Sequence, residues 1–177
     1  MKYYTLLILL ISFIYPRRDC LQQQELDRLG RPLGRPDAIQ DSTLSPKGHF
    51  YIHYDLTGNE APDITDNNNN GTPDYVDEVG IIADSAHKVI TEIMGYDSSP
   101  PDSDGKYDIY IVTYGPKQYG LCVNEGNGIS YLKIDNDYLG YDSAFSQTPL
   151  EIMQSALVHE YFHAIQYGYQ EHHGTGQ

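Results

Sequence analysis

Cysteine is scarce in this chain of 177 residues, which contains only two, Cys20 and Cys122. Two cysteines are too few for the disulfide framework of a small secreted domain. A single bridge is compatible with an oxidising compartment, and the sequence leaves the pairing of Cys20 with Cys122 open. With 40% hydrophobic and 20% charged residues, the chain is nevertheless long enough to bury a core as one domain.

Positive charge is also scarce. The chain has 11 Lys and Arg against 25 Asp and Glu, which gives a formal net charge of −14. Residues 1–40 carry six basic and four acidic side chains, whereas residues 41–177 carry five and 21. A body this acidic repels phosphate backbones, so we expect no binding to nucleic acid. It attracts cations, although solubility alone also accounts for such a charge.

No apolar run in the sequence is long enough to span a bilayer comfortably. Residues 6–15 are nearly all apolar and follow the positive charge of Lys2, as in the apolar region of an export signal. We therefore predict a signal segment at 1–15, a secreted, extracellular protein and no stable membrane span. A retained signal anchor is the alternative, because no small-x-small cleavage pair precedes Pro16.

Residues 16–47 are predicted to be a linker or pro-segment. They contain the tandem tetrapeptide Leu29–Pro32 and Leu33–Pro36, whose Gly-Arg-Pro units break helix and strand alike. The folded body is placed at residues 48–177.

The body is predicted to have the order strand, helix, strand, strand, helix, which is an α+β chain. Strands are expected at 49–56, 107–114 and 129–135, where apolar and polar residues alternate or β-branched and aromatic residues gather. Residues 74–96 show helical spacing and end near Gly95. The last helix is expected at 146–170, with Ser146 or Thr148 as N-cap.

The last predicted helix carries the sequence His159-Glu160-Tyr161-Phe162-His163. Residues i and i+4 lie on one face of a helix, so His159 and His163 can direct two imidazoles at one zinc ion. Glu160 lies beside that ion and can act as the general base for a zinc-activated water that attacks a peptide carbonyl. The flanking residues are uncharged and mostly apolar, as a buried metal-bearing helix requires.

The third zinc ligand is not evident in the sequence. The continuation His-x-x-Gly-x-x-His is absent, because Gln166 and Tyr169 stand where Gly and His would be needed. On a continuous helix His172 lies about 180° around from His163, and only a turn at Gly168 brings His172 or His173 back. We therefore expect the third ligand beyond Gln177, in a part of the enzyme that this chain lacks.

A second chemical motif, "DNNNNGTPDYVD", begins at Asp66 and has the spacing of a calcium-binding loop. Gly71 occupies the position of the sharp turn. Oxygen ligands are expected from the side chains of Asp66, Asn68, Asn70, Asp74 and Asp77 and from the carbonyl of Thr72. A structural Ca²⁺ would neutralise these carboxylates and fix the start of the first helix. The alternative is a turn rich in Asp and Asn that holds no ion.

Together these blocks resemble the zincin superfamily of metallopeptidases, and within it a group of secreted bacterial metalloproteases. The resemblance is carried by "HFYIHYD", the loop pattern D-x-N-x-N-G-x-P-D-Y-V-D and "HEYFHAIQ", in this order between His49 and Gln166. It implies a zincin-like N-terminal subdomain, with a small mixed sheet packed on two helices. It also implies that the strand at 129–135 pairs with an extended peptide substrate. A missing C-terminal half would supply the third ligand, usually an acidic residue.

The expected function is therefore that of a secreted, calcium-stabilised zinc endopeptidase acting on peptide or protein substrates. The alternative is a non-enzymatic extracellular calcium-binding module, or an inactive fragment, in which the HExxH pattern is incidental. The sequence does not indicate an oligomeric state.

We expect His49 and His53 to be exposed or hydrogen-bonded rather than metal ligands, and His87 to be solvated. Asp102 and Asp104 resemble half of a second ion loop.

Overall fold

The computed structural model describes residues 34–36, 39–114, 118–140 and 147–174, with only the backbone described from residue 170 on. The chain divides into two compact units, Met1–Leu33 and Gly34–Gln177, and every described residue belongs to the second. The predicted signal segment, residues 16–33 of the predicted linker and Cys20 lie outside the described residues.

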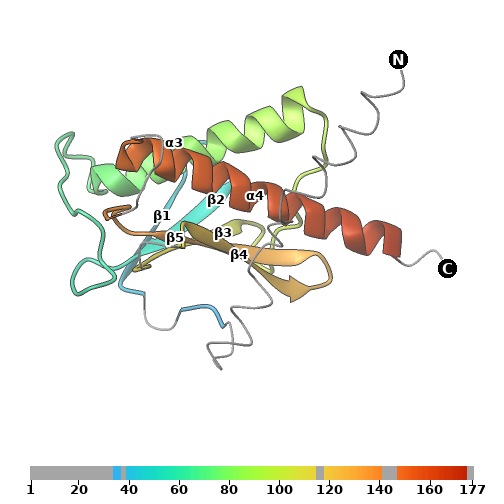
Figure 1. Cartoon of the computed structure of the whole chain (residues 1–177), viewed down its shortest axis with the longest axis horizontal. Coiled ribbons are helices and arrows are strands. Elements are labelled where there is room, and N and C mark those ends of the chain that lie inside the picture. The colour runs from blue at the N-terminus through green and yellow to red at the C-terminus, as the bar shows by residue number, and fades with distance from the viewer. Residues whose placement is uncertain (1–33, 37–38, 115–117, 141–146, 175–177) are drawn as a thin grey trace, which may run out of the picture. The chain divides into compact units, whose positions relative to one another are not determined.

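Five strands form one mixed sheet in the order β1-β2-β3-β5-β4 (Figure 1). Their bounds are Asp41–Leu44 (β1), Phe50–Tyr54 (β2), Tyr107–Val112 (β3), Gly120–Gly126 (β4) and Ile129–Asp135 (β5). The central strands β2, β3 and β5 are parallel, and the edge strands β1 and β4 pair antiparallel to their neighbours. One row of paired residues runs across all five strands and consists of Thr43, Ile52, Ile109, Leu132 and Cys122.

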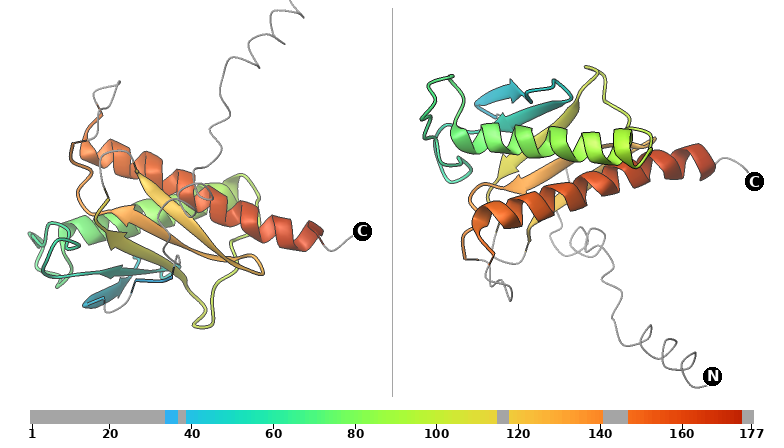
Figure 2. Two further views of the ribbon diagram at one scale, coloured as in Figure 1. Left: turned by 60° about the horizontal axis from the view of Figure 1, so that its bottom comes forward. Right: turned by 90° about the horizontal axis from the view of Figure 1, so that it is seen from above.

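Two helical segments lie side by side on one face of this sheet (Figures 1 and 2). The first is the α-helix α3, Asp74–His87, which continues directly as the π-helix η1, Lys88–Ile93. The second is α4, Pro149–Gly174. Its start is fixed by Thr148 and Glu151, because the backbone N–H of each donates to the side chain of the other at 2.7 and 3.3 Å. This reciprocal arrangement is a capping box and makes Thr148 the N-cap.

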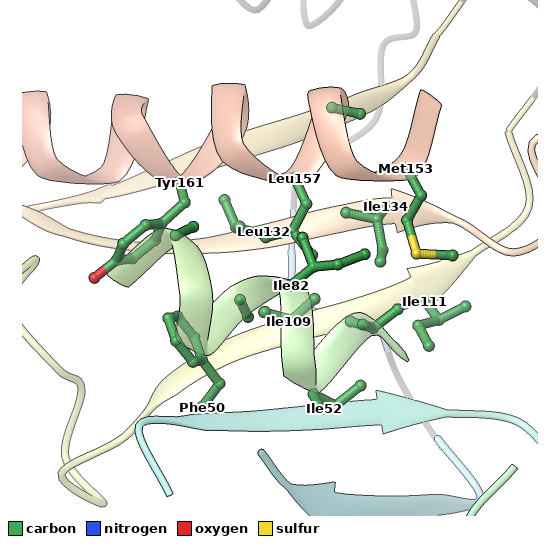
Figure 3. Packing of buried hydrophobic residues seen from close by; sticks show 14 of the residues in the cluster. Phe50, Ile52, Ile82, Ile109, Ile111, Leu132, Ile134, Met153, Leu157 and Tyr161 are labelled. Atoms are coloured by element: carbon green, nitrogen blue, oxygen red, sulfur yellow. The ribbon is translucent and has the colours of Figure 1, made fainter. Parts of the chain in front are cut away.

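The core lies between the sheet and the two helices. Figure 3 shows Leu157 and Tyr161 of α4 directed toward Leu132 of β5 and Phe50 of β2, with Ile82 of α3 beside them. All five side chains are at most 6% exposed. Because successive side chains of a strand point to opposite faces, the alternate residues of β2, β3 and β5 lie on the other face, which we call the open face.

The open face is rich in aromatic and charged side chains. The His53 and Tyr110 rings stack at a centroid distance of 4.5 Å, and Tyr110 meets Tyr131 edge-on at 5.4 Å. Asp108 of β3 and Lys133 of β5 belong to the same face, since they alternate with buried core residues.

The α+β class, the mixed sheet and the two helices agree with the sequence analysis, and five of the elements were predicted. Two strands were not. β1 lies inside the segment predicted as linker, so the folded body begins before residue 48. β4 was overlooked because its sequence, GLCVNEG, begins and ends with glycine and lacks a clear alternation. Among the described residues, no helix is both long enough and apolar enough to cross a membrane.

Candidate metal centre

The helix α4 brings the two predicted zinc ligands together. The Nε2 atoms of His159 and His163 are 3.0 Å apart, and the two rings meet edge-on with centroids separated by 4.6 Å. Two nitrogens bound to one tetrahedral zinc at about 2.0–2.1 Å would be roughly 3.3 Å apart. The pair therefore fits a shared zinc ion after a small adjustment of the side chains.

Gln166 orients one of these imidazoles. Its Oε1 lies 2.8 Å from Nδ1 of His163, on the opposite side of the ring from His159. Because an amide oxygen only accepts hydrogen bonds, Nδ1 carries the proton and Nε2 keeps its lone pair toward the metal position. Gln166 stands where metal-binding histidines usually have an outer hydrogen-bond partner.

Glu160 is held by the edge strand. Its Oε2 accepts a hydrogen bond of 2.8 Å from the backbone N–H of Cys122, which therefore points away from β5. Burial raises the pKa of the Glu160 carboxyl, while the imidazoles of His159 and His163 and the Cys122 N–H lower it; the net direction is upward. A carboxyl with a raised pKa is suited to general acid–base chemistry near neutral pH.

Gly120 allows the edge strand to approach this carboxylate. A Cβ atom at position 120 would lie 3.0 Å from Cγ of Glu160 and 3.2 Å from the carbonyl oxygen of Lys133. Any side chain there would push β4 or Glu160 away. Neither Gly120 nor Cys122 has a recognisable signal in the sequence, because the role of each depends on β4 pairing with β5 beside α4.

No third zinc ligand is found in the part of the chain that the structure describes. Among those residues, the only group of three His, Cys, Asp or Glu ligand atoms lying within 4.8 Å of one another is Asp102, Asp104 and Asp108. Gly168 does not turn the chain, since α4 runs unbroken to Gly174. The backbones of residues 172 and 173 therefore lie about 13–15 Å along the helix axis from His163.

Tyr161, between the two histidines, is anchored in the core by His87 of α3. The Tyr161 hydroxyl lies 2.8 Å from Nδ1 of His87, and His49 stacks on that imidazole at a centroid distance of 4.1 Å. His87 is half-buried rather than solvated, so the expectation for it was wrong; its ring contacts His49, Phe50 and Tyr161. His53 is hydrogen-bonded, as expected, at 2.8 Å to Asp108.

The predicted calcium loop is closed by its own side chains. Asp66 accepts the backbone N–H groups of Asn70 and Gly71 at 3.3 and 3.0 Å. The carboxylate of Asp77 meets the side-chain amides of Asn68 and Asn70 at 3.1 and 2.8 Å. The structure therefore brings the predicted ligands at loop positions 1, 3, 5 and 12 to one place.

Two other predicted calcium ligands, Asp74 and Thr72, make contacts of their own within the loop. Asp74 turns to Asn67, whose backbone N–H it accepts at 3.2 Å, and the backbone N–H of Thr72 donates to Oδ1 of Asn70 at 2.7 Å. The carboxylates of Asp66, Asp74 and Asp77 do not gather within 4.8 Å of one another. The donor set, which consists only of oxygens, still suits a hard cation such as Ca²⁺, with the two Asn amides rotated to present oxygen.

The sheet order corrects the expected substrate strand. β5, residues 129–135, pairs with β3 on one side and β4 on the other, so it has no free edge for an extended peptide. β4 is the edge strand, and among the described residues no strand pairs with its outer side. The sequence analysis misplaced the edge because it missed β4.

The candidate centre therefore consists of two imidazoles and one carboxylate on α4, and the carboxylate is bound to the edge strand β4. Comparison with family models, curated proteins and solved structures gives no match for this chain.

Proposed function

We propose that this chain is the zinc-binding and substrate-binding part of a zincin-type endopeptidase. The observation that carries the proposal is the convergence of the His159 and His163 Nε2 atoms at 3.0 Å beside the Glu160 carboxylate. Two imidazole nitrogens that point at one position are suited to zinc, and a carboxylate one residue away is suited to proton transfer. When bound there, zinc would lower the pKa of water toward neutrality and polarise a carbonyl group.

The residues of this chain have separate roles in the proposal. His159 and His163 hold the metal, and Gln166 keeps His163 in the required tautomer. Glu160 accepts a proton from the attacking water and returns it to the leaving amine. The Cys122 N–H holds the Glu160 carboxylate at the sheet edge until then.

The outer edge of β4 is the proposed place for the substrate. A peptide that pairs with this edge would run directly past Glu160, because the Cys122 N–H on that edge already contacts the carboxylate. Addition of a strand to a free sheet edge uses backbone hydrogen bonds for affinity and neighbouring pockets for specificity. An extended peptide is therefore a more suitable substrate than a compact small molecule.

Calcium has a structural role in this proposal. The loop that contains Asp66 and Asp77 leads into α3, and α3 packs on α4 through the core. An ion in the loop would fix the first turn of α3 and so support the helix that carries the histidines. This part of the proposal also suits the alternative function, a calcium-binding module without catalysis.

Zinc affinity and peptide hydrolysis, measured on the full chain, test the proposal. We expect His159→Ala and His163→Ala each to weaken zinc binding at least tenfold. Glu160→Gln should retain zinc and abolish cleavage of a fluorogenic peptide library. His173→Ala is a matched control on the same helix and should leave zinc binding unchanged.

Three results would count against the proposal. If the parent and both histidine variants bind zinc with the same affinity, His159 and His163 do not form a metal centre. If the Glu160→Gln variant hydrolyses peptide at the parental rate, Glu160 is not the general base. A parent chain whose stability responds to calcium but that binds no zinc would favour the non-enzymatic calcium-binding module.

A further inference from the structure

The short segment Gly34–Pro36 contacts the open face of the sheet through Arg35. The guanidinium is surrounded by three carboxylates from three places in the chain. Nε and Nη2 bind the two oxygens of Glu125 at 3.1 and 2.8 Å, and Nη1 lies 2.8 Å from Oδ2 of Asp102. Nη1 also contacts Oδ2 of Asp108.

The surroundings of Arg35 add to these ion pairs. The guanidinium lies over the ring of Tyr131, 5.3 Å from its centroid, and the ring is fully buried. Lys133 donates from Nζ to the carbonyl oxygen of Gly34 at 3.1 Å, so the backbone beside Arg35 is also bound. Asp108 is only 4% exposed and is fixed from the other side by His53 at 2.8 Å.

Charge requires a cation at this position. Asp104 lies within 4.8 Å of both Asp102 and Asp108, so four carboxylates, with Glu125, are near one guanidinium. Without that guanidinium, the nearly buried Asp108 would lose its ion pair and would keep the contact with His53. A buried carboxylate without a cationic partner is strongly destabilising.

The contacts are specific for a guanidinium rather than an ammonium. Three different nitrogens of Arg35 contact three different carboxylates, one of them in a bidentate pair with both oxygens of Glu125. A lysine side chain has a single nitrogen and cannot reproduce this fork. Cation–π contact with the ring adds to the preference for arginine.

We propose that Asp102, Asp108, Glu125 and Tyr131 form an arginine-binding site, and that its ligand is the Gly-Arg-Pro segment at residues 34–36. The sequence around it supports this proposal, because Leu33–Pro36 repeats the tetrapeptide Leu29–Pro32 letter for letter. The chain thus carries two copies of one ligand sequence, and the site holds the second. The same site accepts a Gly-Arg-Pro peptide supplied separately once Arg35 is removed.

This site has a consequence for the predicted linker or pro-segment. Asp108 belongs to β3, Glu125 to β4, and Tyr131 to β5, so Arg35 joins three strands to the segment that precedes β1. Residues 34–36 are therefore a bound part of the body. The inference does not depend on zinc or on peptide hydrolysis.

The first test compares two arginines in identical tetrapeptides within the full chain. Arg35→Ala should lower the melting temperature by about 3–8 °C, because it leaves Asp108 without its cation. Arg31→Ala should shift it by less than about 1 °C. Arg35→Lys, which keeps the charge, should lie between them. Equal melting temperatures for Arg35→Ala, Arg35→Lys and the parent would overturn the proposal.

The second test supplies the ligand separately. The full chain with Arg31→Ala and Arg35→Ala is titrated with acetyl-Leu-Gly-Arg-Pro-amide while the ring resonances of Tyr131 are followed by NMR. We expect saturable shifts, and at least tenfold weaker binding of the same peptide with Lys in place of Arg. Absence of saturable shifts, or equal binding of the two peptides, would overturn the proposal. If the double variant does not fold, the titration is made on Arg35→Lys.

Discussion

Gly120 determines how closely the edge strand approaches the candidate base. Its missing side chain leaves room for Cγ of Glu160, which a Cβ atom would meet at 3.0 Å. The residue has no other evident role, since its backbone conformation is one that any amino acid adopts. Gly120 is therefore a positioning residue: it sets the distance between β4 and α4 and so the position of Glu160.

We predict that Gly120→Ala impairs hydrolysis more than it impairs zinc binding. The added methyl group must displace Glu160 or β4, at a cost of about 1–3 kcal/mol in stability. Zinc affinity should change less than threefold, whereas peptide hydrolysis should fall at least tenfold. Gly34→Ala is the matched control, because a Cβ there meets nothing within 4 Å. Loss of zinc affinity and hydrolysis in equal measure would contradict this role.

His87 makes the stability of the body depend on pH. Burial lowers the pKa of this imidazole, and the stacked His49 lowers it further, although Asp84 and Glu92 act in the opposite direction. Between the folded pKa and the ordinary value near 6.5, the unfolded chain binds more protons than the folded chain. The stability contributed by neutral His87 is therefore complete above about pH 6.5 and is lost as the pH falls through the folded pKa.

We predict that His87→Gln flattens this part of the pH profile. The variant should be less stable than the parent at pH 7.5, because it loses the ring stacked on His49, and the difference should shrink as the pH falls toward 5. The measurement is the urea midpoint at several pH values in the presence of a chelator, so that metal binding does not contribute. A difference that is constant with pH would show that His87 does not titrate in this range.

At the scale of elements, the long and regular segments could be predicted and the short ones could not. The helices at Asp74 and Pro149 and the strands β2, β3 and β5 all carry clear apolar patterns. β1 has four residues, none of them buried, so it is a strand only because β2 is beside it. β4 carries two glycines at its ends and a bulge between Asn124 and Gly126, which obscure its alternation.

In the candidate site too, the local features could be predicted from the sequence and those that depend on the sheet topology could not. His159, Glu160 and His163 follow from spacing on a single helix, which is a local property of the sequence. The Cys122 N–H, Gly120 and the free edge of β4 depend on which strand is last in the sheet, which is a property of the whole topology. Arg35 was predicted to be in a linker or pro-segment, because the acidic site that binds it is assembled from β3, β4 and the loop before β3.

The calcium loop allows a prediction about the start of α3. If the loop binds Ca²⁺ only when folded, free calcium at 100 times the dissociation constant stabilises the body by about 2.7 kcal/mol. Asp66→Ala should remove this gain, because Asp66 holds the turn at Asn70 and Gly71. Thermal unfolding with calcium and with chelator provides the measurement.

Asp63→Ala is the control for the calcium loop. Asp63 lies just before the loop and binds only Thr65 among the contacts described, at 2.7 Å to its hydroxyl and 3.0 Å to its N–H. This variant should keep the full response to calcium even if its basal stability is lower. A parent chain whose unfolding is unaffected by calcium would show that the loop is a turn without an ion.

At the scale of the whole molecule, negative charge is the dominant electrostatic feature. Residues 41–177 contain 21 acidic and five basic side chains, so most carboxylates repel one another more than they are attracted by a cation. In local arrangements such as the one around Arg35, attraction between carboxylates and a cation exceeds the repulsion between carboxylates. The molecule as a whole should be stabilised by anything that screens like charges.

We predict that sodium chloride raises the melting temperature of the full chain in the presence of a chelator. Between 0.01 and 0.15 M salt the screening length falls from about 30 Å to about 8 Å, which weakens repulsion between distant carboxylates more than contacts at 3 Å. The rise should be visible by calorimetry as a shift of a few degrees. A fall in melting temperature with salt would mean that close ion pairs outweigh the general repulsion.

The hydrogen bond between Cys122 and Glu160 has a practical consequence. An amide on the outer side of an edge strand normally exchanges its proton with solvent quickly, because nothing protects it. Here the Glu160 carboxylate covers the Cys122 N–H at 2.8 Å. The deuterium exchange rate of this one amide therefore reports whether the carboxylate is at the sheet edge or has moved to serve an arriving metal, water or peptide.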